Sequence, residues 1–156
     1  ERILDLMDLA SLSFRTFAHA TEDEERVERA LKFASGAEEI TKSKSEGYHG
    51  NPIVVMEAKI SRSREIKAFF ASLPIDDVQR LLDTLERRVD EESMFFLRLD
   101  KQAAYEGRVG LGENDDVISV RGKVKSYPQS RSNALVTMRN ILESTLEQMT
   151  RKGQKS

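Results

Sequence analysis

Cysteine and tryptophan are both absent from the 156-residue sequence, and histidine occurs only twice. Without thiols the protein has no disulfide bonds, no thiolate metal ligands and no cysteine nucleophile, which favours an intracellular location. His19 and His49 are too few for a histidine-rich metal site. No apolar run is long enough to cross a bilayer. We therefore expect a cytoplasmic protein that has no membrane partner.

Signatures of catalysis and of cofactor binding are also missing. The sequence contains no phosphate-binding glycine loop and no dinucleotide-binding fingerprint. A two-metal nuclease site would need clustered carboxylates, but no spacing brings the candidates together: Asp90, Asp100, Glu106, Asp115 and Asp116. A Ser-His-Asp site would need a histidine as its base, and no nucleophile motif is present. We expect no catalytic residue, no metal and no cofactor.

The composition is typical of a soluble globular protein, with 38% hydrophobic and 33% charged residues. A chain of this length is expected to form one domain. We place that domain at residues 12–146, between an N-terminal extension at 1–11 and a flexible basic tail at 147–156. The net charge of −2 does not indicate a nucleic-acid partner, so any such function must depend on how the charges are distributed.

Alternation of apolar and polar residues predicts the strands. They are expected at 12–20, 53–60, 94–99 and 117–127, with a weaker strand at 37–45. In the first of these, Phe14 and Thr16 lie on one face and Arg15, Phe17 and His19 on the other.

Apolar residues at spacings of three and four predict the helices. We interpret the acidic run at 22–25 as a helix start and not as a metal site, with Thr21 as the N-cap of a capping box. Ser61 is expected to cap a second helix. A third helix is expected from 75 to 89, and a last one from about Ser130.

Strands and helices follow one another without a regular βαβ rhythm, which indicates the α+β class. We expect a single antiparallel or mixed sheet that is covered by helices on one face. The other face of such a sheet remains available to water or to a partner.

The stretch SVRGKVKSYPQSR, residues 119–131, is basic, and no Asp or Glu occurs between Asp116 and Glu143. Strand alternation divides its residues into two faces. One face is apolar or small and can build a core: Ile118, Val120, Gly122, Val124 and Ser126. The other face carries three cations and an aromatic ring: Arg121, Lys123, Lys125 and Tyr127.

The strand at 94–99 has the same two-sided pattern, with Phe96 and Arg98 pointing outward. Cations beside aromatic rings suit RNA, because phosphates attract cations and unpaired bases stack on flat side chains. The candidate RNA-binding residues are Arg15, Arg62, Arg64, Arg98, Lys101, Arg121, Lys123, Lys125, Tyr127 and Arg131. The alternative for each is an ordinary solvated side chain.

The loop EGYHGNP, residues 46–52, has two interpretations. Tyr48 and His49 could stack on a base. A β-turn in which the glycines adopt left-handed conformations is the simpler explanation.

Five stretches, in chain order, carry a family resemblance: FAHATEDEERV, EGYHGNPIVVMEAKI, RLLDTLERRVDEE, FLRLDKQAAYEG and DDVISVRGKVKSYPQSR. Together they resemble a family of small archaeal RNA-binding proteins that were proposed as exosome-associated. The resemblance implies a fold similar to that of the ribosomal protein that binds 5S rRNA. It also implies RNA as a partner, in RNA processing with exosome or ribosome-related proteins. No binding residue is carried over from the family.

Two functions from different classes follow. The first is a non-catalytic RNA-binding protein that contacts phosphates through a basic sheet face. The alternative is an adaptor or homodimer, in which the open sheet face with Met94 and Phe96 packs against a protein partner.

Overall fold

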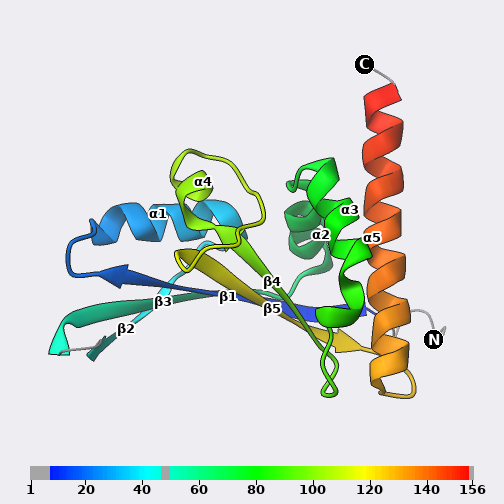
Figure 1. Ribbon diagram of the computed structural model, residues 1–156, viewed down its shortest axis with the longest axis horizontal. Coiled ribbons are helices and arrows are strands. Elements are labelled where there is room, and N and C mark those ends of the chain that lie inside the picture. Colours follow the sequence, from blue (N-terminus) through cyan, green and yellow to red (C-terminus); the bar gives the residue numbers. More distant parts are fainter. Residues whose placement is uncertain (1–7, 47–49, 155–156) are drawn as a thin grey trace. The chain divides into compact units, whose positions relative to one another are not determined.

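The computed structural model describes residues 8–46 and 50–154. Its five strands form one antiparallel sheet in the order β2-β3-β1-β5-β4, as Figure 1 shows. The strands are β1 (Asp8–His19), β2 (Thr41–Glu46), β3 (Pro52–Ile60), β4 (Met94–Asp100) and β5 (Val117–Lys125). The α+β class predicted from the sequence is therefore confirmed.

The helices lie between and after the strands. They are α1 (Glu24–Ser35), α2 (Ser63–Ala71), α3 (Ile75–Asp83), α4 (Lys101–Tyr105) and α5 (Arg131–Gln154), and a short 3-10 helix, η3, covers Leu85–Arg87. No helix in the described part of the chain is both long and apolar enough to span a membrane.

The contacts divide the chain into two compact units. Unit 1 comprises residues 1–12, 61–97 and 121–156, and unit 2 comprises residues 13–60 and 98–120. The first unit thus contains α2, α3 and α5, whereas the second contains α1, α4, β2 and β3. Strands β1, β4 and β5 each contribute residues to both units.

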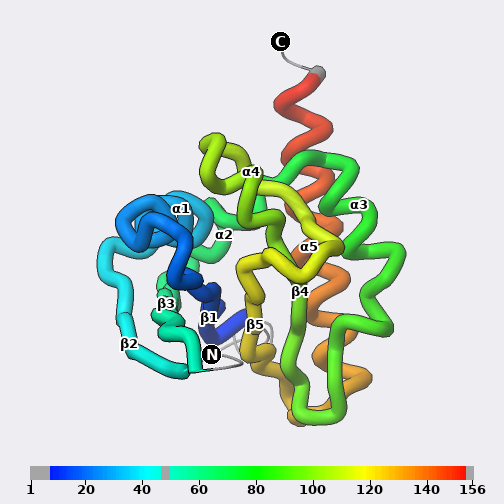
Figure 2. Tube along the Cα trace, turned by 60° about the vertical axis from the view of Figure 1, so that its left-hand side comes forward, coloured from blue at the N-terminus to red at the C-terminus, as the bar shows by residue number. Residues whose placement is uncertain are grey.

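Unit 2 is built around helix α1, which packs against β3 and α4 (Figure 2). Val27 and Leu31 on α1 are fully buried, as are Phe14 on β1 and Met56 on β3. Strands β2 and β3 form an antiparallel hairpin in which Thr41 pairs with Glu57 and Glu46 with Pro52. Residues 47–49, including Tyr48 and His49, lie outside the described residues.

Unit 1 is held together by the long helix α5, which packs against α2, α3 and η3 (Figure 2). Met138 and Leu142 on α5 and Leu81 on α3 are fully buried. Gly122 on β5 is closely packed, since a Cβ there would lie 2.8 Å from Leu9 Cδ2 and 3.0 Å from Leu12 Cδ2. A larger residue at this inward-facing position would require these leucine side chains to shift.

The helix starts differ from those predicted by one or two residues. Asp23, not Thr21, is the N-cap of α1, and its carboxylate accepts a hydrogen bond from the Glu25 amide. The start of α2 is similarly displaced, because Arg62 is its N-cap in place of Ser61. The shift at α1 follows from two alternative cap residues, Thr21 and Asp23, close together in the sequence. At α2 the Glu65 carboxylate accepts a hydrogen bond from the Arg62 amide.

Three element boundaries also differ from the predicted ones. Strand β1 begins at Asp8 and so includes part of the segment expected as an extension. Helix α3 ends at Asp83, and Val89 instead forms a β-bridge with Phe95. Helix α5 continues to Gln154, through most of the expected tail. A hydrogen bond from Thr150 Oγ1 to the Leu146 carbonyl lies within this last part of α5.

Candidate nucleic-acid interface

The basic side chains of β5 in unit 1 point away from the core, as the strand alternation predicted. Arg121, Lys123 and Lys125 are exposed, whereas Val120 and Val124 between them are buried. None of the three cations has a carboxylate partner among the residues that the structure describes. Their positive charges are therefore uncompensated by the described part of the protein.

An aromatic ring accompanies these cations in unit 1. The guanidinium carbon of Arg121 lies 5.7 Å from the centroid of the Phe96 ring on β4. Phe96 is half-buried, while its neighbours Phe95 and Leu97 are buried on the opposite face. This cation–π contact orders the arginine above an aromatic surface without consuming its hydrogen-bond donors.

Tyr127 follows β5 and has 60% of its surface exposed. The turn that presents it is fixed by Gln129, whose side chain accepts a hydrogen bond from the Ser126 amide and donates one to the Val124 carbonyl. The tyrosine therefore extends from a constrained turn into solvent.

Arg131, the next predicted residue, is instead engaged by the backbone of unit 1. Its Nε donates to the Val89 carbonyl at 3.0 Å and its Nη2 to the Glu86 carbonyl at 2.7 Å. The guanidinium thereby ties the start of α5 to the segment around η3. Phosphate contact by Arg131 would compete with these bonds.

Arg62 and Arg64 are exposed at the start of α2 in unit 1. The Glu65 carboxylate accepts a hydrogen bond from the Arg62 amide, so a negative side chain already occupies this helix start. The first-turn amides are consequently less available to an external anion than the sequence suggested.

Unit 2 has its own exposed arginines on β1 and β4. The guanidinium carbon of Arg15 lies 5.5 Å from the Phe17 ring centroid, and Phe17 is 42% exposed. Arg98 is also exposed. Phe17 was predicted to face outward but was not among the candidate RNA-binding residues.

Lys101 differs from every other predicted cation, because its side chain is only 1% exposed. Its Nζ donates to the Phe17 carbonyl at 2.7 Å and pairs with the carboxylates of Glu22 at 2.9 Å and Asp116 at 3.2 Å. The ammonium therefore has no free surface for a phosphate. Lys101 is the first residue of α4, and its side chain is buried within unit 2.

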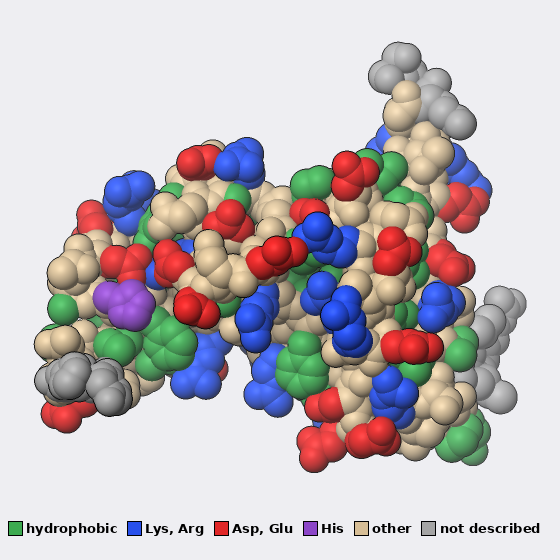
Figure 3. Space-filling model, in the orientation of Figure 1, with side chains coloured by type: hydrophobic (Ala, Val, Ile, Leu, Met, Phe, Trp, Pro, Cys, Tyr) green, Lys and Arg blue, Asp and Glu red, His purple; other side chains and the backbone are tan. Residues whose placement is uncertain are grey.

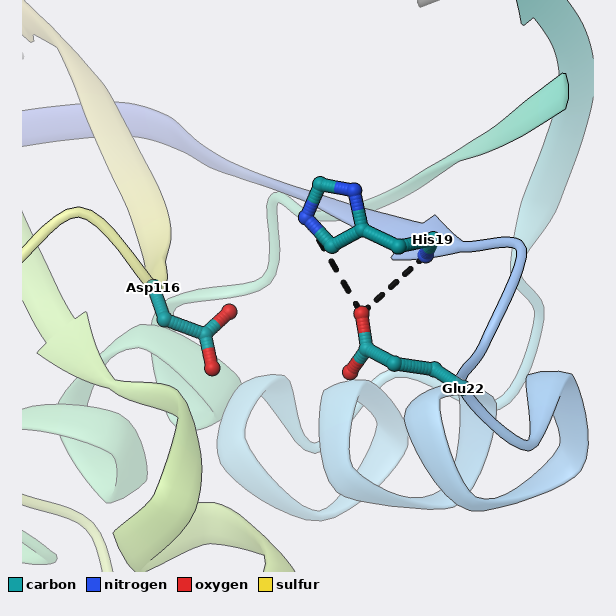
Figure 4. Close-up of side chains that lie close together, drawn as sticks. All are labelled: His19, Glu22 and Asp116. Atoms are coloured by element: carbon teal, nitrogen blue, oxygen red, sulfur yellow. Dashed lines mark hydrogen bonds and ion pairs between the residues drawn. The ribbon is translucent and has the colours of Figure 1, made fainter. Parts of the chain in front are cut away.

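Around Lys101, three side chains of metal-ligating type lie close together: His19, Glu22 and Asp116 (Figure 4). Their nearest ligand atoms are all within 4.8 Å of one another. On the face drawn in Figure 3, acidic side chains lie next to the histidine. The Lys101 ammonium contacts both carboxylates. It therefore occupies the place that a metal ion would take between Glu22 and Asp116.

Hydrogen bonds around this cluster shift two pKa values. Partial burial acts to raise the pKa of Glu22, but hydrogen bonds from Lys101, the His19 amide and Tyr105 outweigh it, so the pKa is lowered. The pKa of Tyr105 is raised well above its usual value, first by burial and then by donating its hydroxyl proton to Glu22. Glu22 is thus held as a carboxylate that fixes both Lys101 and Tyr105.

Sequence reasoning missed this network because its members come from separate elements. Glu22 was assigned to the acidic run at a helix start, and Asp116 was a carboxylate that no spacing brought close to the others. A possible signal was the position of Lys101 immediately after the buried residue Leu99 and the N-cap Asp100.

Comparison with known proteins identifies similar sequences and structures. The model of a family described as RNA binding matches residues 11–124. An RNA-binding protein of Pyrococcus abyssi is 40% identical over 85% of this chain and 93% of its own length. An uncharacterized protein of Methanocaldococcus jannaschii is 32% identical over 70% of this chain and 80% of its own.

A solved structure gives the same relationship at the level of the fold. A DUF54 protein from Methanothermobacter thermautotrophicus superposes with a TM-score of 0.76 at 36% identity. The match covers 87% of this chain and 98% of that protein.

Proposed function

The chain belongs to this RNA-binding family, and from that premise we propose that it binds RNA through the outward face of β5 in unit 1. Arg121, Lys123 and Lys125 contact phosphates, and Phe96 and Tyr127 stack on bases. Arg15 and Arg98, on exposed strand positions of unit 2, are proposed as further phosphate contacts.

The observation that carries this proposal is the group of three uncompensated cations on β5. Alternate residues of a strand lie about 6.6 Å apart, so the three charges form a regular row along one face. Like charges placed so close repel one another, and the core requires only the inward residues of the strand. A polyanion offers the counter-charge that the described part of the chain does not supply.

Phe96 and Tyr127 favour unpaired over duplex RNA. Bases inside an A-form helix are stacked on one another, whereas bases in loops and single strands are free to stack on aromatic side chains. We therefore propose single-stranded RNA or the loop of a structured RNA as the ligand class.

Four of the predicted cations are not part of the proposed phosphate contact on β5: Lys101, Arg131, Arg62 and Arg64. The first two are engaged inside their own units. The last two shortly precede Glu65, whose carboxylate accepts a hydrogen bond from the Arg62 amide. We propose that they have, at most, a supporting role in RNA binding.

We propose further that the protein is not catalytic, in keeping with a family described by binding alone. The resemblance to a family proposed as exosome-associated leads us to propose a cytoplasmic role in RNA processing beside exosome or ribosome-related proteins. The tagged protein can be purified from cells, and exosome or ribosome-related proteins that copurify with it can be identified. Comparing samples before and after ribonuclease treatment tests whether RNA mediates the association.

The direct test is charge reversal of Arg121, Lys123 and Lys125 to Glu. Fluorescence anisotropy with a labelled single-stranded RNA should show at least a hundred-fold loss of affinity, since three phosphate contacts become repulsions. A matched control reverses three exposed cations elsewhere, Lys44, Lys59 and Arg139. It changes the net charge equally and should lose less than about ten-fold.

Equal losses in the two variants would show that only net charge matters, which contradicts the proposed site. Size-exclusion chromatography with light scattering tests the adaptor alternative. A salt-insensitive dimer that has no affinity for RNA would overturn the proposed function in favour of a protein–protein role.

A further inference from the structure

A groove of about 350 Å³ lies between α1 and α4 in unit 2. Its volume is within the range of roughly 300–1,000 Å³ that is typical of small-ligand sites. The groove is lined by Arg26, Arg29, Ala30, Phe33, Ala104, Tyr105 and Gly107. None of these residues belongs to the strand face proposed above for RNA binding.

The floor of the groove contains a fixed aromatic ring with a guanidinium stacked on it. The Arg26 guanidinium carbon lies 4.9 Å from the centroid of the Tyr105 ring. The Tyr105 hydroxyl donates to Glu22 at 2.8 Å, and Glu22 is in turn held by Lys101. A guanidinium stacked in this way keeps its N–H edge available for an anion.

The second guanidinium of the groove, that of Arg29, is exposed on the next turn of α1. Several carboxylates of unit 2 are already paired, Glu24 and Glu28 with Lys42, Glu22 and Asp116 with Lys101, and Glu106 with Arg108. Glu25, four residues before Arg29 on α1, is exposed. Within residues 8–46 and 50–154, neither Arg26 nor Arg29 has a carboxylate partner. The residues that line the groove include two arginines and no acidic side chain.

Phe33 completes the site with an apolar surface. It is 49% exposed and lies four residues after Arg29, so both side chains and Arg26 occupy one face of α1. Across the groove, Gly107 has φ +78° and open space where a Cβ would stand. A flat ring can thus approach Phe33 without meeting a side chain at residue 107.

We propose that this groove binds one nucleotide of an RNA chain, with the phosphate between Arg26 and Arg29 and the base on Phe33. Two guanidinium groups recognise a phosphate by paired hydrogen bonds, and an exposed phenyl ring stacks on any base. The inference rests on RNA being the ligand, and it adds a contact on the helical side of unit 2 that is separate from the strand residues.

The test uses ¹⁵N-labelled full-length protein titrated with uridine monophosphate, uridine, inorganic phosphate and a uridylate trinucleotide. The monophosphate and the trinucleotide should shift the amide signals of Phe33 and Gly107. Uridine and phosphate, each carrying half of the recognised chemistry, should bind at least about ten-fold more weakly. The trinucleotide should bind no less tightly than the monophosphate.

Matched variants assign the shifts to the groove. The double variant Arg29→Ala/Phe33→Ala should weaken trinucleotide binding by about ten-fold or more. The conservative variant Phe33→Tyr and the distant Arg139→Ala should stay within about three-fold of the wild type. All the substituted positions are exposed, so the same spectra report whether each variant is folded.

Unchanged Phe33 and Gly107 signals, or equal trinucleotide affinity of the Ala/Ala variant and the wild type, would overturn the groove assignment. Tighter binding of the monophosphate than of the trinucleotide would also overturn it, since the groove would then serve a free nucleotide. If the strand-face charge reversal still abolishes oligonucleotide binding, these failures leave the proposed function intact. A wild-type protein without oligonucleotide affinity contradicts the proposed function itself.

Discussion

Lys123 in unit 1 and Lys101 in unit 2 have the same side chain, and both were predicted to contact RNA. Lys123 is exposed and has no carboxylate partner in the described chain. Lys101 is buried among two carboxylates and a backbone carbonyl. The same ammonium is thus free to bind a partner in one unit and is part of the fold in the other.

The difference shows that uncompensated charge, and not positive charge alone, distinguishes a binding surface. In unit 2 each buried donor of Lys101 meets an acceptor, as burial of a charge requires. In unit 1 the row on β5 meets no carboxylate of the described residues, and Arg121 lies over the Phe96 ring. Predictions that separate the two cases therefore compare folding stability with RNA affinity.

Lys101→Met should have the largest effect on folding. It should lower the free energy of unfolding by about 2–4 kcal/mol, because Glu22 and Asp116 then lose a shared partner while remaining partly buried. Lys123→Met should change it by less than about 0.5 kcal/mol, as expected for an exposed side chain. Urea denaturation followed by circular dichroism measures both.

RNA affinity should reverse this order. The folded fraction of Lys101→Met should bind RNA like the wild type, whereas Lys123→Met should bind several-fold more weakly. Equal losses of stability in the two variants would contradict the comparison.

The neighbouring residues Phe95 and Phe96 on β4 provide a second comparison of stability with RNA affinity, and the expected effects are of intermediate size. Phe95→Leu should lower the free energy of unfolding by about 1–2 kcal/mol, because it leaves space in a buried core. Phe96→Leu should leave stability nearly unchanged but weaken binding of single-stranded RNA by about ten-fold, the loss expected for one stacked base. A Phe96→Leu variant with full RNA affinity would remove this ring from the proposed interface.

The smallest effect is expected in the acid range of the stability profile. The pKa of Glu22 is lowered in the folded state, so its stabilising contribution is present above the ordinary glutamate pKa. It is lost as the pH falls through the folded value. Glu22→Gln should be less stable than the wild type at neutral pH, and this difference should shrink on acidification. A difference that is constant with pH would show that ionisation of Glu22 does not stabilise the fold.

Local periodicity was sufficient to predict the strand face. Alternation along β5 placed Val120 and Val124 inside and Arg121 and Lys123 outside, and the burial of these residues confirms it. The half-buried, outward-facing position of Phe96 on β4 follows from the same period. These predictions succeed because side-chain direction in a strand depends on the strand alone.

The position of Lys101 could not be predicted in this way. Its partners Glu22 and Asp116 are separated from it by 79 and 15 residues, so only the tertiary fold brings them together. The choice between Thr21 and Asp23 as helix cap was equally undetermined, since both side chains can accept a hydrogen bond from a helix amide. That choice leaves Glu22 outside α1 and free to meet Lys101.

The proposed groove combines both kinds of information. The spacing of Arg26, Arg29 and Phe33 along α1 is visible in the sequence. The ring of Tyr105, which forms the floor of the groove, comes from α4 and is apparent only in the fold.

The salt dependence of RNA binding tests the central claim most directly. Replacing Arg121, Lys123 and Lys125 with Gln removes three charges while preserving polar side chains on an exposed face. In a plot of log affinity against log salt concentration for single-stranded RNA, the slope should become shallower by about 2, roughly 0.7 for each phosphate that the variant no longer neutralises. An unchanged slope together with unchanged affinity would contradict the assignment of RNA binding to the outward face of β5.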